Sequence, residues 1–331
     1  MRAPRFWSNP RGRPGLLSGL LWPLSLLWVA GGLWRRWRAD PRRSEIPVLC
    51  IGNLTAGGAG KSPMVAALQD RMRARSIDAH VVSSGYGGRV PGPHRVDEGR
   101  DTAERVGDEP LVLAARGPVW IARDRAAGAA AAAAAGADLV LLDDGFQNPG
   151  LIKDASVVMV DAGAGFGNGR VIPSGPLRES VALGLRRADL VVLVGSPDER
   201  AACQAAWPEL AAVSMLGAAL VPQRTGLPLD GEDVIAFAGI GRPEKFFNTL
   251  RGLGARLLAT HAFADHQPFA RAVLNRMIRE SREASAILVT TEKDAVRLPA
   301  DMRTEILTVQ VTLVPEDWSL LDAMIDDLLA R

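Results

Sequence analysis

Cysteine, tyrosine and histidine are scarce in this chain of 331 residues, with two, one and four copies respectively. The two cysteines, Cys50 and Cys203, stand alone in apolar segments and match no Cys-x-x-Cys spacing. Their isolation argues against a disulfide framework and a cysteine-based zinc site, and it fits a reducing compartment. Because 47% of the residues are hydrophobic and 23% are charged, the composition also excludes an intrinsically disordered chain.

Acidic residues are nearly absent from residues 1–43, which hold nine arginines and one acid, Asp40. This head carries a net charge of +8, which leaves −6 for the rest of a chain whose total is +2. The positive charge therefore belongs to the head alone, and the mildly acidic body predicts no nucleic-acid partner. No feature of the sequence indicates an obligate protein partner.

Charged residues are also missing from Pro14 to Trp34, a stretch rich in leucine and tryptophan with arginines on both flanks. A helix needs about 20 apolar residues to cross a bilayer core, and Trp and Arg at its edges are typical of headgroup-level anchors. Pro23 and four glycines weaken a regular helix here. Four interpretations stay open: a spanning helix, an anchor lying in one leaflet, a cleaved signal peptide and a buried soluble helix. The first two predict association with a membrane surface.

The body alternates short apolar runs with helical stretches, a pattern that predicts a doubly wound α/β sheet. The runs expected to be buried strands are Ile46–Ile51, Ala79–Ser83, Val119–Ala122, Asp138–Leu142, Ser156–Val160 and Asp189–Val194. Helices are expected from about Lys61 to Arg75 and over the alanine-rich segment Ala126–Ala137.

A second α/β run begins near Val234, after a Pro- and Gly-containing stretch, Val221–Gly231, that is the best candidate for a linker. Its expected strands are Val234–Ala238, Ala255–Ala259, Ala286–Thr290 and Ile306–Val311, and its expected helices are Pro243–Leu253, Gln267–Glu283 and Glu316–Leu329. We therefore predict a head (1–43), a core domain (44–228) and a smaller C-terminal lobe (229–331). A cleft between two such lobes is a usual ligand site.

The segment Thr55-Ala56-Gly57-Gly58-Ala59-Gly60-Lys61-Ser62 lies between an expected strand and an expected helix. It matches the phosphate-loop pattern except that Thr55 replaces the opening glycine. Glycines let backbone N–H groups face phosphates, and the helix N-terminus adds a favourable field. Lys61 should reach the β- and γ-phosphates and Ser62 should bind Mg²⁺. The loop thus predicts binding of ATP or a similar nucleoside triphosphate.

Three further sites carry candidate chemistry. Asp143 and Asp144 end a buried strand, where a P-loop protein usually holds Mg²⁺. Asp108 precedes Glu109 and Pro110, and it could serve as a helix cap or as a general base for a hydroxyl acceptor. His266 follows Asp265 at a loop-to-helix junction facing the expected cleft, so it could be structural or functional.

These motifs together resemble the tetraacyldisaccharide 4′-kinase (lipid A 4′-kinase) family over nearly the whole chain. The matching segments include the Trp-rich head, the phosphate loop with its opening threonine, Gly107–Pro110, Asp143–Gln147, Phe166–Gly169, Pro173–Glu179, Phe237–Pro243, Asp265-His266 and Thr291–Asp294. The resemblance implies an ATP- and Mg²⁺-dependent kinase with two P-loop-like α/β lobes and an N-terminal membrane helix. Its acceptor would be the 4′-hydroxyl of tetraacyldisaccharide 1-phosphate, and its body would face the cytoplasm at the inner membrane.

The resemblance also implies roles for individual residues. Asp108 is similar to the catalytic base and His266 to its partner, while Asp143, Asp144 and Glu179 are similar to carboxylates around Mg²⁺. Arg125 and Arg178 are similar to positions near the sugar-phosphate head of the lipid. Two residues depart from the family pattern: Ser84 stands before Gly-Tyr-Gly in place of arginine, and Asn148 follows Asp-Asp-Gly-Phe-Gln in place of histidine.

Two other classes of P-loop protein are alternatives to a lipid kinase. A membrane-tethered GTPase usually carries an Asn/Thr-Lys-x-Asp loop, and Thr291-Glu292-Lys293-Asp294 lacks its spacing because the lysine and aspartate are adjacent. The ATPase subunit of a transporter should show a signature loop that the sequence does not contain. The apolar head favours a kinase with an acylated acceptor. Moving such a lipid out of a bilayer costs about 0.8 kcal/mol of free energy per buried CH₂, so an enzyme anchored at the membrane can reach it without that cost.

Overall fold

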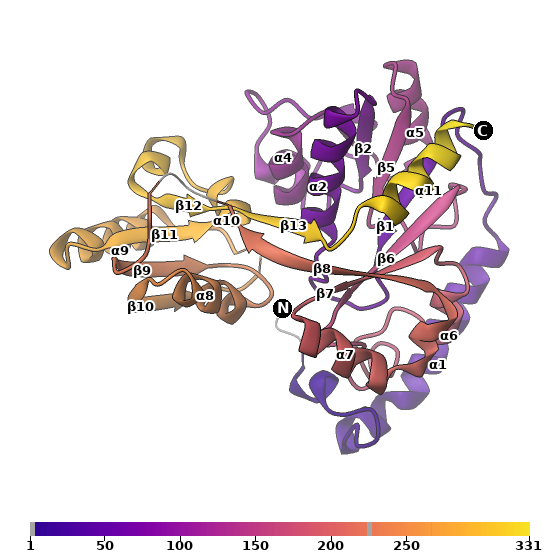
Figure 1. The fold of residues 1–331 in the computed structure, drawn as a ribbon, viewed down its shortest axis with the longest axis horizontal. Helices are drawn as coiled ribbons and strands as arrows, with labels where there is room; N and C mark the ends of the chain where they lie inside the picture. Colours follow the sequence, from indigo (N-terminus) through magenta and orange to yellow (C-terminus); the bar gives the residue numbers. More distant parts are fainter. Residues whose placement is uncertain (1–3, 224–226, 266) are drawn as a thin grey trace.

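Two α/β lobes make up the computed structural model, which describes residues 4–223, 227–265 and 267–331 (Figure 1). The larger lobe is built on a nine-stranded sheet in the order β13-β8-β7-β6-β1-β5-β2-β4-β3. Neighbouring strands are parallel except for the pairs at the two edges, β13 with β8 and β3 with β4. The predicted doubly wound α/β fold of the P-loop type is confirmed.

The strands of this sheet are β1 (Val48–Gly52), β2 (Ala79–Ser83), β3 (His94–Arg95), β4 (Val119–Ile121), β5 (Leu139–Asp143), β6 (Ala155–Asp161), β7 (Leu190–Val194), β8 (Ser214–Pro222) and β13 (Val311–Pro315). The helices of the larger lobe are α1 (Leu16–Trp37), α2 (Lys61–Ala74), α3 (Ala103–Val106), α4 (Asp108–Ala114), α5 (Arg125–Ala134), α6 (Val181–Leu185), α7 (Pro197–Ala206) and α11 (Ser319–Leu329). Two short 3-10 helices, η1 (Arg5–Ser8) and η2 (Pro208–Ala212), complete it.

The smaller lobe has a four-stranded parallel sheet in the order β10-β9-β11-β12. Its strands are β9 (Asp233–Ala238), β10 (Arg256–Ala262), β11 (Ile287–Thr291) and β12 (Leu307–Val309). Its helices are α8 (Pro243–Gly252), α9 (Arg271–Glu283), α10 (Glu292–Ala295) and the 3-10 helix η3 (Ala300–Glu305). Two hydrophobic clusters pack on this sheet. One includes residues of α8 and the other includes residues of α9.

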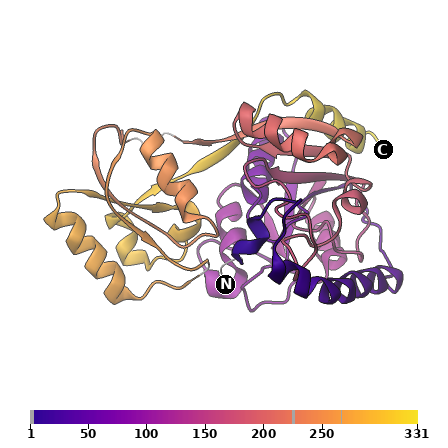
Figure 2. The same cartoon turned by 90° about the horizontal axis from the view of Figure 1, so that it is seen from below.

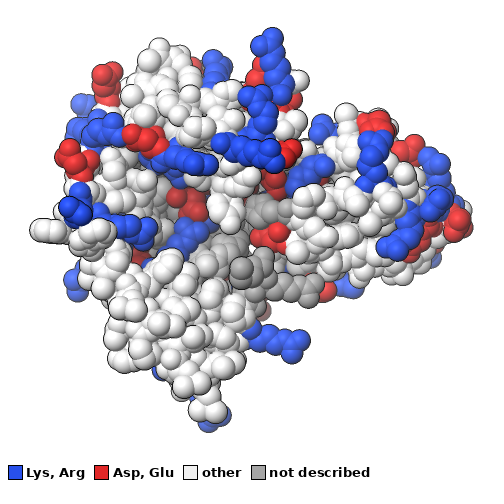
Figure 3. All heavy atoms as spheres, turned by 180° about the vertical axis from the view of Figure 1, so that it is seen from behind, with Lys and Arg blue, Asp and Glu red and all other residues white. Residues whose placement is uncertain are grey.

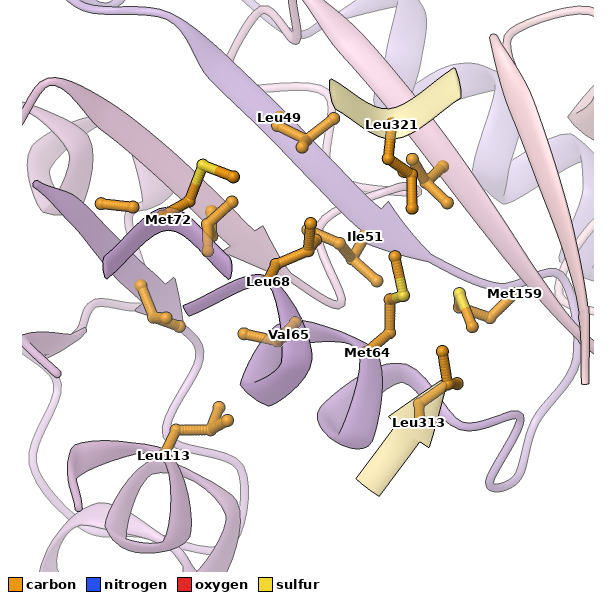
Figure 4. Packing of buried hydrophobic residues seen from close by; sticks show 14 of the residues in the cluster. Leu49, Ile51, Met64, Val65, Leu68, Met72, Leu113, Met159, Leu313 and Leu321 are labelled. Carbon is orange, nitrogen blue, oxygen red and sulfur yellow. The ribbon is translucent and has the colours of Figure 1, made fainter. Parts of the chain in front are cut away.

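The C-terminal boundary that we predicted is wrong in one respect. The expected single strand 306–311 is two strands, and β13 leaves the smaller lobe to pair antiparallel with β8 of the large sheet. Helix α11 follows it, so residues 311–331 belong to the larger lobe. In Figure 4 Leu313 of β13 and Leu321 of α11 pack beside Met64 and Leu68 of α2. The first two residues of the predicted linker belong to β8, which extends to Pro222.

Because α11 packs in the core of the larger lobe, shortening one of its buried side chains should destabilise the protein. Leu321→Ala removes a side chain with no exposed surface and should lower the free energy of unfolding by about 2–5 kcal/mol. Leu320→Ala is the matched control, because Leu320 is 47% exposed and the loss of its side chain should cost little. Denaturant titration of both variants measures the difference, and equal midpoints would contradict the placement of α11.

The N-terminal head lies along the larger lobe and has two faces. Ser18 and Ser25, seven residues apart on α1, are buried and donate hydrogen bonds to the carbonyl groups of Ser174 (2.7 Å) and Val171 (2.8 Å). The rest of the helix is mostly exposed, and it is long and apolar enough to cross a membrane by length and composition. Large exposed side chains on it are Leu16, Leu17, Leu20, Trp22, Leu24, Leu26, Leu27, Trp28, Leu33, Trp34 and Trp37.

Figures 2 and 3 show where α1 lies on the larger lobe and how apolar that side of the surface is. Helix α1 runs along one side of the larger lobe in Figure 2, and the same side, at the lower left of Figure 3, is largely white with blue at its margins. The helix is therefore held by its polar serines and presents its leucines and tryptophans outward. This arrangement suits a helix that lies in the plane of a membrane interface.

Candidate active site

The predicted phosphate loop connects β1 to α2, as expected from its sequence. Residues 55–60 form the loop, and Lys61 and Ser62 are the first two residues of the helix. Gly57 (φ +133°) and Gly60 (φ +86°) adopt backbone conformations that side chains disfavour, which explains the glycines. The backbone N–H of Ala56 donates to the carbonyl of Pro176 at 2.7 Å, so a second loop supports the first.

Asp143 and Asp144 lie beside this loop because β5 pairs with β1, with Asp143 opposite Ile51. Lys61 Nζ is 3.7 Å from Asp144 Oδ1. Arg178 binds the same carboxylate with both terminal nitrogens, at 2.8 and 3.1 Å. Asp144 has φ +51°, an uncommon backbone conformation for a non-glycine residue that is found at functional sites. Lys61, Asp144 and Arg178 therefore lie together beside the phosphate loop.

The two aspartates differ in their electrostatic state. Burial raises the pKa of Asp143 well above its ordinary range, and the negative charges of Glu109 and Asp144 add to the rise. Burial also opposes ionisation of Asp144, but Lys61 and Arg178 overcome it and lower the pKa of that carboxyl. Asp143 Oδ2 accepts from Ser83 at 3.1 Å, while its buried Oδ1 has no hydrogen-bond partner among the described residues.

These oxygens fit a magnesium ion. Mg²⁺ is usually held by one or two carboxylates together with waters and substrate phosphates, so a cage of protein ligands is not required. The unpaired Oδ1 of Asp143, the carboxylate of Asp144 and the hydroxyl of Ser62 at the helix start supply oxygen ligands of that kind. A bound cation would also reverse the high pKa of Asp143. Within the described residues no group of three or more His, Cys, Asp or Glu side chains could hold a metal.

Glu179, which the resemblance places with the two aspartates, contacts arginines in this structure. Both of its oxygens accept from Arg187 at 2.6 Å, and Oε2 also accepts from Arg36 at 2.7 Å. Gln147 connects the two groups, since its amide nitrogen donates to Glu179 at 3.2 Å and its oxygen accepts from Arg178 at 3.2 Å. Both oxygens of Glu179 are thus engaged by side chains, and Glu179 is connected to Asp144 through Gln147 and Arg178.

Asp108 is the buried first residue of α4, and Gly107 is the N-cap of that helix. Asp108 is therefore not the N-cap of α4, which was the alternative to its role as a general base. Arg297 Nε of the smaller lobe lies 3.3 Å from Asp108 Oδ2, and Lys293 Nζ lies 3.2 Å from Glu109. The predicted base consequently lies where the two lobes meet. His266, its predicted partner, lies outside the described residues.

The two predicted substrate arginines have different surroundings. Arg178 is half-buried at Asp144, as described above. Arg125 is buried at the start of α5, where Asp124 caps the helix, and donates to the carbonyl of Ala122 at 2.6 Å. The departure at Asn148 has a local role, because its side-chain oxygen accepts from the backbone N–H of Gly150 at 2.8 Å.

A second contact between the lobes lies at the end of β6. Asp161 Oδ2 accepts from Arg242 at 2.7 Å and from Lys245 at 2.6 Å, both in the smaller lobe. Asp161 pairs with Val194, and the Val194 side chain lies 3.5 Å from the place where a Cβ on Gly60 would stand. This contact therefore holds the smaller lobe next to the phosphate loop.

Several of these charged residues were not predicted from the sequence. They are Arg36, Glu109, Asp161, Arg187, Arg242, Lys245, Lys293 and Arg297. The motifs Phe237–Pro243 and Thr291–Asp294 were recognised, but their residues were given no role. Cations that reach the site from separate segments leave no local pattern, and only the packing of the lobes brings them together.

Comparison with known proteins identifies relatives of this chain and a shared fold. Residues 17–330 match the family model described as tetraacyldisaccharide-1-P 4′-kinase (LpxK). A protein named tetraacyldisaccharide 4′-kinase from Jannaschia sp. (strain CCS1) is 52% identical over 332 residues, covering all of both chains. A protein of the same name from Dinoroseobacter shibae is 52% identical over 329 residues, 99% of this chain and 98% of its own. The crystal structure of LpxK from Aquifex aeolicus in complex with ATP shares the fold, with a TM-score of 0.74, 24% identity and coverage of 95% of this chain and 100% of its own.

Proposed function

Since the chain belongs to the tetraacyldisaccharide-1-P 4′-kinase family, a family of phosphotransferases, we propose that it moves the γ-phosphate of ATP to the 4′-hydroxyl of tetraacyldisaccharide 1-phosphate. The meeting of Lys61, Asp144 and Arg178 at the phosphate loop supports this reaction most directly. The outward leucines and tryptophans of α1 support an acceptor that is a lipid.

The proposed chemistry follows from the charges at the site. The loop N–H groups and Lys61 hold the triphosphate, and phosphoryl transfer needs mainly positioning and charge neutralisation. Asp143, Asp144 and Ser62 would hold Mg²⁺, which neutralises charge on the phosphate oxygens when bound. Asp108 accepts the proton of the acceptor hydroxyl. The hydroxyl oxygen forms a bond to the γ-phosphorus as the bond from that phosphorus to the bridging oxygen breaks, and ADP leaves with the electron pair.

A GTPase is less well supported. Asp294, the acid of the Thr-Glu-Lys-Asp segment, is buried and accepts from the backbone N–H of Gly239 at 3.0 Å and from the Thr291 hydroxyl at 2.7 Å. An acid engaged in this way supports the lobe and is not presented to a guanine base. Comparing ATP with GTP in a binding assay discriminates the two classes.

The direct test is a phosphoryl-transfer assay. Purified protein, labelled ATP, Mg²⁺ and tetraacyldisaccharide 1-phosphate should give a bisphosphorylated lipid and ADP in equal amounts. Nucleotide hydrolysis without labelled lipid would point to an ATPase. No turnover with any acceptor would contradict the proposed function.

We place the enzyme on the cytoplasmic side of the inner membrane, with α1 in the interface. Leu20 and Leu27 are 75% and 69% exposed on the outward face of α1. Burial of a leucine contributes about 1.5–3 kcal/mol, so a Leu20→Asp/Leu27→Asp variant should bind lipid vesicles about 100-fold more weakly or worse. Vesicle co-sedimentation measures this, and Leu258→Asp, at an exposed leucine of the smaller lobe, is the control. Unchanged co-sedimentation of the double variant would exclude α1 as the anchor.

A further inference from the structure

Arg297 joins three loops of the smaller lobe from a buried position just after α10. Its side chain is 6% exposed. One terminal nitrogen donates to the carbonyl of Gln267 at 2.9 Å, and the other donates to the carbonyl of Gly239 at 3.0 Å and pairs with Asp294. These partners follow β10, β9 and β11 respectively, so one guanidinium holds together the loops at the carboxyl ends of three parallel strands.

These contacts fix the guanidinium in place. The ring of Phe269 packs against it, with the ring centroid 5.1 Å from Cζ, and Asp294 itself accepts from the backbone N–H of Gly239 at 3.0 Å. The planar fork of an arginine is pre-organised, so little freedom is left to lose when such a group meets another charge. Arg297 therefore presents a positive charge at a position that the smaller lobe determines.

The Nε atom is the part of Arg297 that the smaller lobe does not use. It is buried, has no hydrogen-bond partner among the described residues and lies 3.3 Å from Oδ2 of Asp108 in the larger lobe. The side chain of Asp108 is also buried, at 9% exposed. The contact is thus an ion pair between the lobes, and it joins a fixed cation to the proposed general base.

Other ion pairs connect the lobes at the same place, so their docking does not depend on Arg297 alone. Lys293 Nζ lies 3.2 Å from Glu109, and Arg116 lies 3.5 Å from Glu292. The side chains of both pairs are more exposed than those of Arg297 and its partner. The buried pair differs from them in its partner, which is the residue that takes the hydroxyl proton.

We propose that Arg297 is a positioning residue for Asp108 and holds its carboxylate in the orientation that accepts the proton of the acceptor hydroxyl. This inference rests on the proposed function. A general base acts only when its oxygen lies within hydrogen-bond reach of the proton that it takes, and a free carboxylate turns about its own side-chain bonds. A fixed cation beside one oxygen restricts that rotation. The base then belongs to one lobe and its restraint to the other.

The test is a double-mutant cycle on phosphoryl transfer by the full-length protein. Arg297→Gln is introduced into the wild type and into Asp108→Asn, and single-turnover transfer from labelled ATP to tetraacyldisaccharide 1-phosphate is measured for each protein. Steady-state rates give the KM for ATP, and thermal midpoints report folding. Glu292→Gln is the matched control, because it removes a different ion pair between the lobes from the same short helix, α10.

Misplacement of a catalytic group by about 1 Å can cost about 100-fold in rate, so Arg297→Gln should lower the transfer rate about 10- to 100-fold and leave the KM for ATP within about twofold. In Asp108→Asn the same substitution should change the rate less than about twofold, because the base that Arg297 positions is already gone. Arg297→Lys keeps a positive charge beside Asp294 and should recover part of the loss. Glu292→Gln should stay within about twofold of its parent in both backgrounds.

Equal losses from Arg297→Gln in the two backgrounds would overturn the proposal, because Arg297 would then serve the lobe or another group. An unchanged rate in the wild-type background would overturn it as well. If Arg297→Gln does not fold, Arg297→Lys makes the same comparison, and its loss of about three- to tenfold should likewise vanish in Asp108→Asn. Absence of transfer by the wild type would overturn the proposed function and this inference together, whereas normal wild-type transfer with equal losses overturns the inference alone.

Discussion

Lys61→Ala should lower kcat about 100- to 1000-fold, because transition-state charge on the transferred phosphoryl group loses its nearest fixed cation. Lys61 begins α2, its side chain is only 12% exposed, and its Nζ is held near Asp144. No other cation from the phosphate loop can take its place. The measurement is steady-state phosphoryl transfer to the acceptor lipid at saturating ATP.

Two observations separate a chemical effect from a folding effect in that experiment. Arg73→Ala, on the same helix with a 61% exposed side chain, should keep wild-type activity. The thermal midpoint of Lys61→Ala should stay near that of the wild type, because Arg178 still pairs with Asp144. A kcat within tenfold of the wild type would remove Lys61 from the reaction.

Asp108→Asn should lower kcat about 100- to 10,000-fold, the range that a positioned general base contributes. The amide keeps the shape of the side chain but cannot take the hydroxyl proton. Since Asp108 lies on α4 and not in the phosphate loop, KM for ATP should change little. Initial rates over a series of acceptor and ATP concentrations measure both quantities.

The control for Asp108 is Glu104→Gln, an exposed acid on the preceding helix. Asp108 also faces Arg297, so its loss could loosen the contact between the lobes. Arg297 keeps its ion pair with Asp294, and the two lobes should therefore stay folded. An Asp108→Asn variant with normal kcat would show that the hydroxyl loses its proton elsewhere.

Local patterns were enough to predict the phosphate loop and the strand-end aspartates. Thr55–Ser62 carries its own turn and helix-start chemistry, and a buried run followed by Asp143 places that acid at the sheet edge next to β1. Parallel strands end on one side of the sheet, so the end of β5 and the phosphate loop after β1 were expected at the same edge. The same reasoning placed most strands of both lobes to within a few residues, but it missed β3 and β8.

Long-range pairing was what the sequence could not supply. Residues 311–315 read as a strand in either lobe, and only their register with β8 assigns them to the larger one. The ion pairs of Glu179 join it to Arg36, 143 residues away in the chain, and to Arg187, which lies outside the recognised motif. Residues 267–270 were expected to begin a helix, but α9 starts at Arg271.

The way the chain leaves and re-enters the larger lobe has an evolutionary consequence. Strands β8 and β13 are paired from Pro222 with Val311 onward, and Gln223 and Gln310 continue the ladder with a 2.9 Å hydrogen bond. The whole smaller lobe is thus an insertion at the tip of one β-hairpin. A two-residue Asn-Gly turn could close that hairpin, and the nucleotide-binding sheet would keep all nine strands. An ancestral single-lobe protein could therefore have acquired its second lobe without any rearrangement of the first.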